Sequence, residues 1–163
     1  MSSLNDLYRE VILDHYRSPR NRGELPSPPA IKSEGKNPVC GDELTLYIDV
    51  ENNLVKDIKI AGSGCSISMA SASMMTKAVM GKSVEEARDL IVEFKAMMDI
   101  HEQNLDDQKD THQEKAELGE LEALTGVVKF PVRIKCATLA FNTLTNALDA
   151  SEGKASENVA TTE

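Results

Sequence analysis

Hydrophobic positions in the N-terminal third of the chain change from a helical period to an alternating one. Apolar side chains recur every three or four residues over 4–17, which predicts a helix. Residues 17–38 are rich in proline and glycine without an apolar period, so we expect an extended connector there. Apolar and polar residues then alternate over 44–50, and a second apolar run follows the turn at 51–53. This pattern predicts an antiparallel hairpin over residues 44–61, and a third short strand is expected at 64–67.

Helical periods dominate from residue 69 onward. A short helix is expected up to Gly81, and a second helix begins at the capping box formed by Ser83 and Glu86. A final helix is expected to start near Pro131, because proline is favoured in a first helical turn. This order of elements predicts an α+β fold in which a small antiparallel three-stranded sheet packs against helices.

Two segments depart from the pattern of a packed domain. Residues 99–122 hold nine acidic residues and two lysines, which is typical of a solvated or mobile surface segment. Residues 151–163 carry few apolar side chains and predict a disordered tail. The sequence therefore predicts a single domain over 1–150 with an acidic insertion at about 99–122.

The charge balance and the cysteine count limit the functions to consider. A net charge of −9 argues against nucleic acid or an anionic membrane as a partner. No apolar run reaches the roughly 20 residues of a membrane span, and the start "MSSLNDLYRE" lacks a signal-peptide pattern. We therefore expect a cytoplasmic protein with reduced thiols. Three cysteines exclude a framework made only of disulfides.

Each of the three cysteines lies at the predicted boundary of an element. Cys40 is in a turn before a strand, Cys65 follows the glycines of "AGSG", and Cys136 falls near the start of the last helix. A helix start and the basic residues before it favour a lowered thiol pKa at Cys136. A buried, chemically inert thiol is the alternative for any single cysteine.

Asp42 adds a carboxylate two residues after Cys40, on the same side of an extended chain. Three thiolates and one carboxylate suit a four-coordinate zinc ion. The spacing does not single out a metal site, since the chain has no Cys-x-x-Cys pair. A metal site and three packing cysteines therefore both remain open from the spacing alone.

Three stretches resemble the U-type iron–sulfur cluster assembly proteins. These stretches read "NPVCGDELTLYIDV", "IKIAGSGCSISMASASMM" and "FPVRIKCATLAFNTL". They match a Cys-Gly-Asp turn, a Gly-x-Gly-Cys before a Ser/Ala-rich helix, and a late cysteine before a Leu-Ala helix. Lys135 stands where IscU-type scaffolds have a histidine, and extra residues precede the last cysteine. In both features the chain resembles the zinc-containing SufU branch of the family.

The resemblance implies an IscU/SufU-like fold and a role in sulfur transfer. It implies a zinc-dependent sulfurtransferase whose partner is SufS, a pyridoxal-phosphate-dependent cysteine desulfurase, and which passes sulfur on to a downstream iron–sulfur scaffold. By the same resemblance Cys40 is the sulfur acceptor, and the zinc ligands are Cys40, Asp42, Cys65 and Cys136. Arg133 is a candidate contact for a persulfide anion, although a surface charge near a helix start is the alternative.

Two other functions use the same residues. One is a scaffold that assembles a [2Fe–2S] cluster on the same ligands, and the other is a zinc-stabilised interaction module without chemistry.

The three histidines are expected to lie outside the site, with His15 in a surface or capping role and the other two in the acidic segment. The Met-rich stretch at 68–75 is expected to belong to the core.

Overall fold

The structure, a computed structural model, describes residues 4–27, 29–103, 118–153 and 159–161. Along the chain the elements are α1 (Leu4–Arg17), β1 (Ile31–Asn37), β2 (Asp42–Glu51), β3 (Leu54–Ser63), α2 (Ser66–Val79), α3 (Val84–Gln103), the 3-10 helix η1 (Gly119–Lys129), α4 (Pro131–Ser151) and β4 (Val159–Thr161). The predicted starts of α3 and α4 are confirmed, including the reciprocal hydrogen bonds between Ser83 and Glu86. Most of the predicted acidic insertion, residues 104–117, lies outside the described residues.

The sheet has the strand order β3-β2-β1-β4. Strands β2 and β3 form the predicted hairpin, and β1 pairs antiparallel with β2. Together they make the expected three-stranded antiparallel sheet with helices packed against it. Strand β4 adds a short parallel pairing to β1, in a region where the sequence predicted a disordered tail.

The predicted position of the third strand is wrong. It was expected at 64–67, but α2 begins at Ser66 with Cys65 as its N-cap, and the third strand is β1 within the expected connector. The buried residues of β1 are small or polar, namely Ser33, Gly35 and Asn37, and only the partly buried Ile31 is apolar, so no apolar alternation marks the strand. Ser33 donates a hydrogen bond to the carbonyl of Thr143 at 3.1 Å, and a side chain at Gly35 would collide with Thr143. Close packing of α4 therefore replaces the hydrophobic pattern that a strand normally shows.

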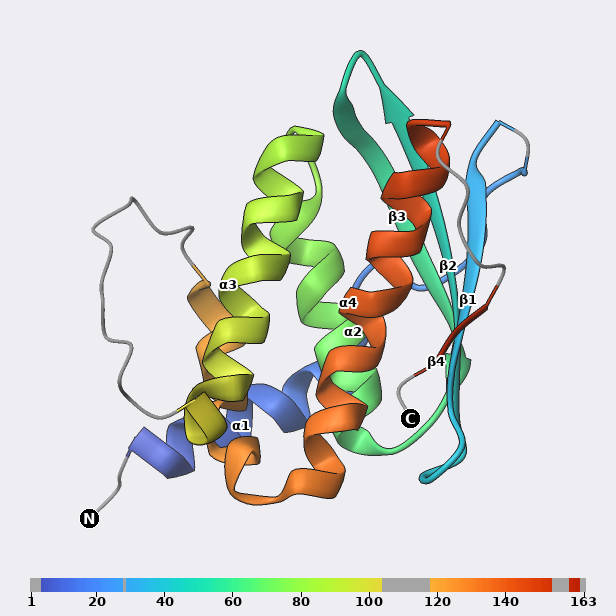
Figure 1. Cartoon of the computed structure of the whole chain (residues 1–163). Helices are drawn as coiled ribbons and strands as arrows, with labels where there is room; N and C mark the ends of the chain where they lie inside the picture. The colour runs from blue at the N-terminus through green and yellow to red at the C-terminus, as the bar shows by residue number, and fades with distance from the viewer. Residues whose placement is uncertain (1–3, 28, 104–117, 154–158, 162–163) are drawn as a thin grey trace.

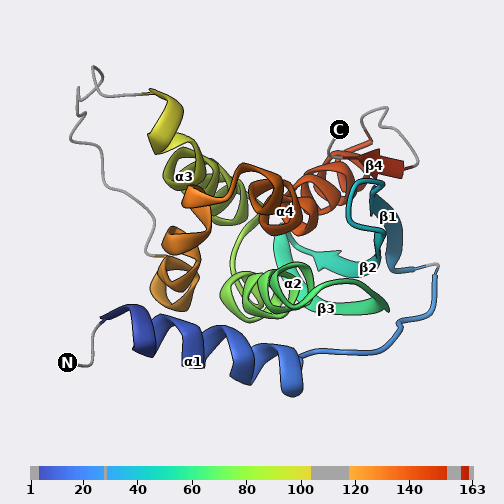
Figure 2. The ribbon, with the colours of Figure 1, turned by 90° about the horizontal axis from the view of Figure 1, so that it is seen from below.

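The helices cover one face of the sheet (Figure 1). Helices α2 and α4 lie directly on the strands, while α1 runs along the outer side of α2 and α3 lies beyond α4 (Figure 2). The core between these layers contains the stacked rings of Phe94 and Phe141, whose centroids are 4.0 Å apart. Met69, Met74 and Met75 are buried, which confirms that the Met-rich stretch belongs to the core. Among the described residues, no helix combines the length and the apolar character needed to cross a membrane.

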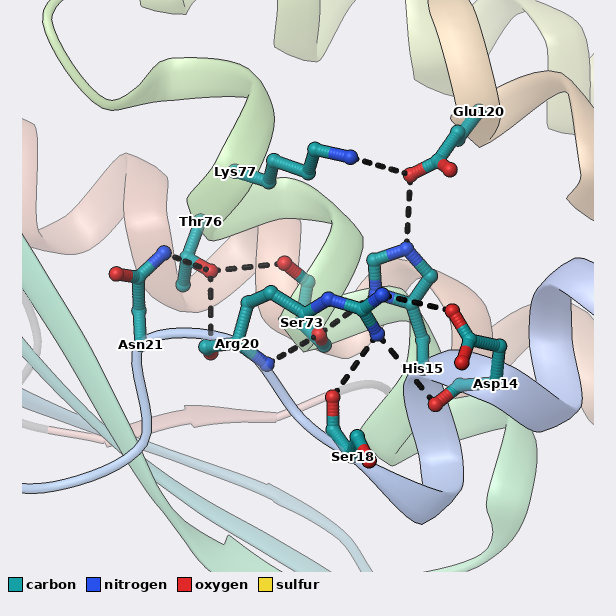
Figure 3. Close-up of polar contacts among 9 residues, drawn as sticks. All are labelled: Asp14, His15, Ser18, Arg20, Asn21, Ser73, Thr76, Lys77 and Glu120. Atoms are coloured by element: carbon teal, nitrogen blue, oxygen red, sulfur yellow. Dashed lines mark hydrogen bonds and ion pairs between the residues drawn. The ribbon is translucent and has the colours of Figure 1, made fainter.

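His15 does not have the surface or capping role that the sequence suggested. Its side chain is fully buried and joins α1 to two other elements (Figure 3). Its Nδ1 lies 2.7 Å from the Ser73 hydroxyl on α2, and its Nε2 lies 2.8 Å from a carboxylate oxygen of Glu120 on η1. The Ser73 hydroxyl also accepts the backbone N–H of Arg20, so its own hydrogen is available to His15 Nδ1. The prediction failed because the partners of His15 are far away in the sequence.

Candidate metal centre

Cys40 lies in the turn that joins β1 to β2. The N–H of Gly41 donates to the carbonyl of Asn37 at 2.9 Å and closes the turn. Gly41 has φ +74, a conformation that glycine adopts without strain. The thiol of Cys40 is half-buried at this turn. The local sequence therefore places a partly accessible thiol at the end of a short hairpin.

Asp42 is the first residue of β2 and is 1% exposed. Its Oδ1 accepts the backbone N–H of Cys65 at 2.9 Å, and its Oδ2 accepts the side-chain N–H of Asn37 at 3.1 Å. Gly64 permits this approach, because a Cβ there would lie 2.6 Å from Asp42 Oδ1. The carboxylate is therefore held from both sides in a single orientation.

Cys65 caps the N-terminus of α2. Its Sγ accepts the backbone N–H of Ser68 at 3.4 Å, which satisfies one of the free N–H groups of the first turn. The capping contact explains why α2 starts at Ser66, three residues before the predicted position. Cys65 thus serves both as a helix cap and, through its own N–H, as a support for Asp42.

Cys136 lies on the buried face of α4. Its Sγ is 3.3 Å from Cys40 Sγ and 3.4 Å from the side-chain nitrogen of Asn37. Burial raises the pKa of this thiol, and its hydrogen bonds to Cys40, Asp42 and Cys65 raise it further. The sequence predicted a lowered pKa from the helix start. That prediction is wrong, because Cys136 comes five residues after Pro131 and desolvation outweighs the helix dipole.

The donor atoms of Cys40, Asp42 and Cys136 all lie within 4.8 Å of one another. Cys65 borders this group: its N–H binds Asp42, and its thiol contributes to the raised pKa of Cys136. Tetrahedral bonds of about 2.3 Å place sulfur donors about 3.8 Å apart, so small side-chain shifts bring this set around one ion. A divalent cation would also offset the cost of ionising a buried thiol. The soft donor set and its spacing therefore fit zinc.

Arg133 brings a positive charge to the thiols. It lies in the first turn of α4, is exposed, and hydrogen-bonds to the thiol of Cys136. This contact, together with the nearby thiols of Cys65 and Cys40, raises the pKa of its guanidinium. The sequence identified Arg133 and the glycines before Cys65 as candidates for the site, but it did not identify Asn37. Asn37 lies in a stretch predicted as connector, and nothing in its local pattern indicates a contact with Cys136, 99 residues away.

A groove of about 880 Å³ lies near the thiols, since its lining includes Ser66, which follows Cys65, and Arg133, which contacts Cys136. It lies between α1, η1 and the N-terminal ends of α2 and α4, and its apolar lining includes Tyr8, Ile12, Ile67, Val127, Phe130 and Val132. Phe130 and Val132 are 59% and 53% exposed, which is high for large apolar side chains. Arg9, Lys129 and Arg133 also line the groove, although the whole chain has a net charge of −9. The groove is therefore both apolar and locally basic.

Comparison with known proteins adds independent information. A family model described as the NifU-like N-terminal domain matches residues 7–138. The chain is 44% identical to the zinc-dependent sulfurtransferase SufU of Bacillus subtilis, covering 93% of this chain and 96% of that protein. It is also 44% identical to the iron–sulfur cluster assembly scaffold protein IscU of Streptococcus pyogenes, covering 93% of this chain and 88% of that protein. A crystal structure from Fervidobacterium islandicum, described as a candidate scaffold protein for the SUF system, superposes with a TM-score of 0.73 at 31% identity. It covers 90% of this chain and 99% of that one.

Proposed function

The chain belongs to the NifU-like N-terminal domain family, and we propose that it is a zinc-dependent sulfurtransferase for iron–sulfur cluster assembly. In this proposal it accepts persulfide sulfur from a SufS-type, pyridoxal-phosphate-dependent cysteine desulfurase and passes it to a downstream iron–sulfur scaffold. The observation that carries the proposal is the cluster of Cys40, Asp42 and Cys136, in which one thiol lies on a turn and the other donors are buried. The 44% identity to the SufU of B. subtilis supports the same activity.

The transfer step exchanges one persulfide for another. The Cys40 thiolate attacks the terminal sulfur of the donor's cysteine persulfide, forming a new S–S bond to Cys40 Sγ. The S–S bond of the donor breaks, and its electron pair leaves on the donor's cysteine thiolate, which takes up a proton. No external oxidant or reductant is required, because the transferred sulfur keeps its oxidation state.

Cys40 is the acceptor in this proposal because of its position. Cys136 is held within α4, and Cys65 is held by its capping bond to Ser68, whereas Cys40 is in a turn. When bound, zinc would keep the thiols ionised and shield them until the donor arrives. Cys65, Cys136 and Asp42 would remain as its ligands while Cys40 reacts. Arg133 is placed to bind the anionic terminal sulfur that Cys40 receives.

The groove beside the thiols supports a protein as the sulfur donor. A small-molecule donor would not need an apolar surface that continues beyond the reactive thiols. The exposed side chains of Phe130 and Val132 are typical of residues buried on association with another protein. Arg9, Lys129 and Arg133 favour a donor surface that carries carboxylates around an apolar centre.

A scaffold that assembles a [2Fe–2S] cluster is the second candidate. The same four side chains would ligate the cluster, and the similarity to the S. pyogenes IscU favours this function. The two functions predict different purified proteins. A sulfurtransferase is colourless with about one zinc per chain, whereas a scaffold is brown and contains iron and sulfide.

The decisive experiment combines metal analysis with mapping of the transferred sulfur. The zinc-loaded chain is incubated with SufS, pyridoxal phosphate and cysteine, and its peptides are examined by mass spectrometry. We expect one added sulfur atom on the peptide containing Cys40, none in Cys40→Ser, and unchanged transfer in Val39→Ser, an exposed neighbour outside the cluster. Persulfide on Cys136 together with an active Cys40→Ser variant would refute the assignment.

A further inference from the structure

The four proposed ligands differ in the hydrogen bonds that the protein gives them. Cys65 Sγ accepts a backbone N–H, and Asp42 accepts two N–H groups. Cys136 Sγ accepts the side-chain N–H of Asn37 and also contacts the exposed Arg133. Cys40 Sγ has only the contact with the Cys136 thiol, and no N–H in the described part of the chain donates to it. Three ligands are therefore supported by fixed donors, and the fourth is not.

Asn37 is the buried residue that contributes to this difference between the two neighbouring thiols; Arg133 also hydrogen-bonds to Cys136, but from the exposed surface. It is fully buried at the end of β1, and both contacts come from its Nδ2, to Asp42 Oδ2 at 3.1 Å and to Cys136 Sγ at 3.4 Å. An amide nitrogen carries two hydrogens, so both bonds form at once. Its backbone carbonyl also closes the turn that carries Cys40.

The orientation of the Asn37 amide is determined by the two acceptors that its Nδ2 reaches, Asp42 and Cys136. Its Oδ1 is buried, and no donor among the described residues reaches it. Turning the amide over would place Oδ1 against the carboxylate of Asp42, which is an acceptor only. The side chain thus leaves its acceptor unsatisfied, at a cost in free energy, in order to donate to Asp42 and Cys136.

We propose that Asn37 is a positioning residue that makes Cys136 a retained ligand and leaves Cys40 as the exchangeable, more nucleophilic thiolate. A hydrogen bond to a thiolate stabilises its negative charge and so lowers its tendency to attack an electrophile. Cys136 receives this stabilisation from Asn37, and Cys40 does not. The inference rests on the proposed metal site, and it adds the reason why only one of two adjacent thiols reacts.

The test measures which thiol reacts when the metal is bound. Zinc-loaded wild type and Asn37→Ala are treated with a limiting amount of iodoacetamide, and labelling of each cysteine is quantified by mass spectrometry. We expect wild type to be labelled at Cys40, and the ratio of Cys40 to Cys136 labelling to fall by about tenfold in Asn37→Ala, as the loss of one charge-assisted hydrogen bond implies. Labelling of Cys65 should change little, since its donor is Ser68.

A spectroscopic measurement separates this role from a general loosening of the fold. In the cobalt-substituted protein, loss of the N–H donor raises the energy of the thiolate lone pairs, so the sulfur-to-cobalt charge-transfer band should move to longer wavelength. The shift should persist in a Cys40→Ser background, where Cys136 still contributes. Asn142→Ala, a half-buried asparagine on the same helix as Cys136, is the matched control and should leave both readouts unchanged.

The possible results separate the inference from the proposed function. An unchanged labelling ratio and an unchanged cobalt band in a folded Asn37→Ala variant would overturn the role of Asn37, even if Cys40 still accepts sulfur. If Asn37→Ala does not fold, Asn37→Ser is used, since its single hydroxyl can serve only one of the two acceptors and an altered ratio or band is still expected. Failure of wild type to bind zinc or to accept sulfur would instead refute the proposed function.

Discussion

Replacing His15 tests how the buried polar network joins α1 to the rest of the molecule. His15→Ala removes a fully buried ring and both of its hydrogen bonds. Loss of the ring costs about 3 kcal/mol by analogy with other large-to-small core substitutions. The buried hydroxyl of Ser73 loses its acceptor, which adds about 1 kcal/mol. Glu120 adds little, since its side chain is 42% exposed and water replaces the imidazole.

We therefore expect His15→Ala to lower the free energy of unfolding by about 4 kcal/mol, a large part of the stability of a domain of this size. Urea titration followed by circular dichroism measures the change. Lys77→Ala is the control, because it removes only the exposed ion pair with Glu120 at 3.3 Å and should cost less than about 1 kcal/mol. A loss below about 1 kcal/mol for His15→Ala, or equal losses for the two variants, would show that the network does not stabilise the fold.

Two partial replacements divide the effect between the two bonds. The side-chain oxygen of His15→Asn can reach the place of Nδ1 and keep the bond to Ser73, whereas His15→Gln can reach Glu120 and leaves Ser73 without its acceptor. We expect His15→Gln to be the less stable of the two, because a buried unsatisfied hydroxyl costs more than a carboxylate that water can reach. Greater stability of His15→Gln would refute this account.

Three further predictions concern the metal centre, the groove and acid stability. Gly64→Ala should push Asp42 out of place, because the new Cβ would lie 2.6 Å from its Oδ1; competition with a chelator should then show faster zinc loss than in wild type. Lys129→Glu should weaken SufS activation at low salt and leave zinc content unchanged, whereas Lys82→Glu, exposed and outside the groove, should do neither. The hydrogen bond from His15 is the main cause that lowers the pKa of Glu120 below 4.5. The stabilisation that ionised Glu120 gives to the fold is therefore complete above pH 4.5 and is lost as the pH falls through the lowered pKa of Glu120. Urea titrations between pH 5 and 3 should show a shallower loss of stability in His15→Ala.

The elements that the sequence predicted well are those whose apolar side chains face the core at a regular period. The hairpin of β2 and β3 alternates over most of its length, with an irregularity between Asp49 and Val50, and α3 and α4 start at a capping box and at a proline. Strand β1 was missed because it packs Ser33, Gly35 and Asn37 against α4, so its fit depends on small size and hydrogen bonding. Such complementarity is a property of two segments and leaves no period in either one.

The candidate site shows the same division. Cysteine and aspartate were identified from their chemistry and from their places at the ends of elements, and the structure brings three of these donors together. Of the supporting residues, the glycines before Cys65 were noted without their partner, and Asn37 was not identified. Asn37 acts on Cys136 through a contact between distant segments, and Gly64 matters only because Asp42 approaches its backbone. The raised pKa of Cys136 likewise comes from burial, which a local sequence pattern does not reveal.

The short distance along the chain between Cys40 and Asp42 has a consequence for chain entropy. Ligands at Cys40 and Cys65 would close a loop of 25 residues. A cross-link of that length lowers the conformational entropy of the unfolded chain and so raises its free energy by about 3.5 kcal/mol. Asp42 and Cys65 would close nearly the same loop, and Asp42 is held in place by donors on both sides. In the proposed metal-bound protein, Cys40 can therefore leave the ion without reopening the loop. The acceptor is free to move because its neighbour two residues away keeps the cross-link closed.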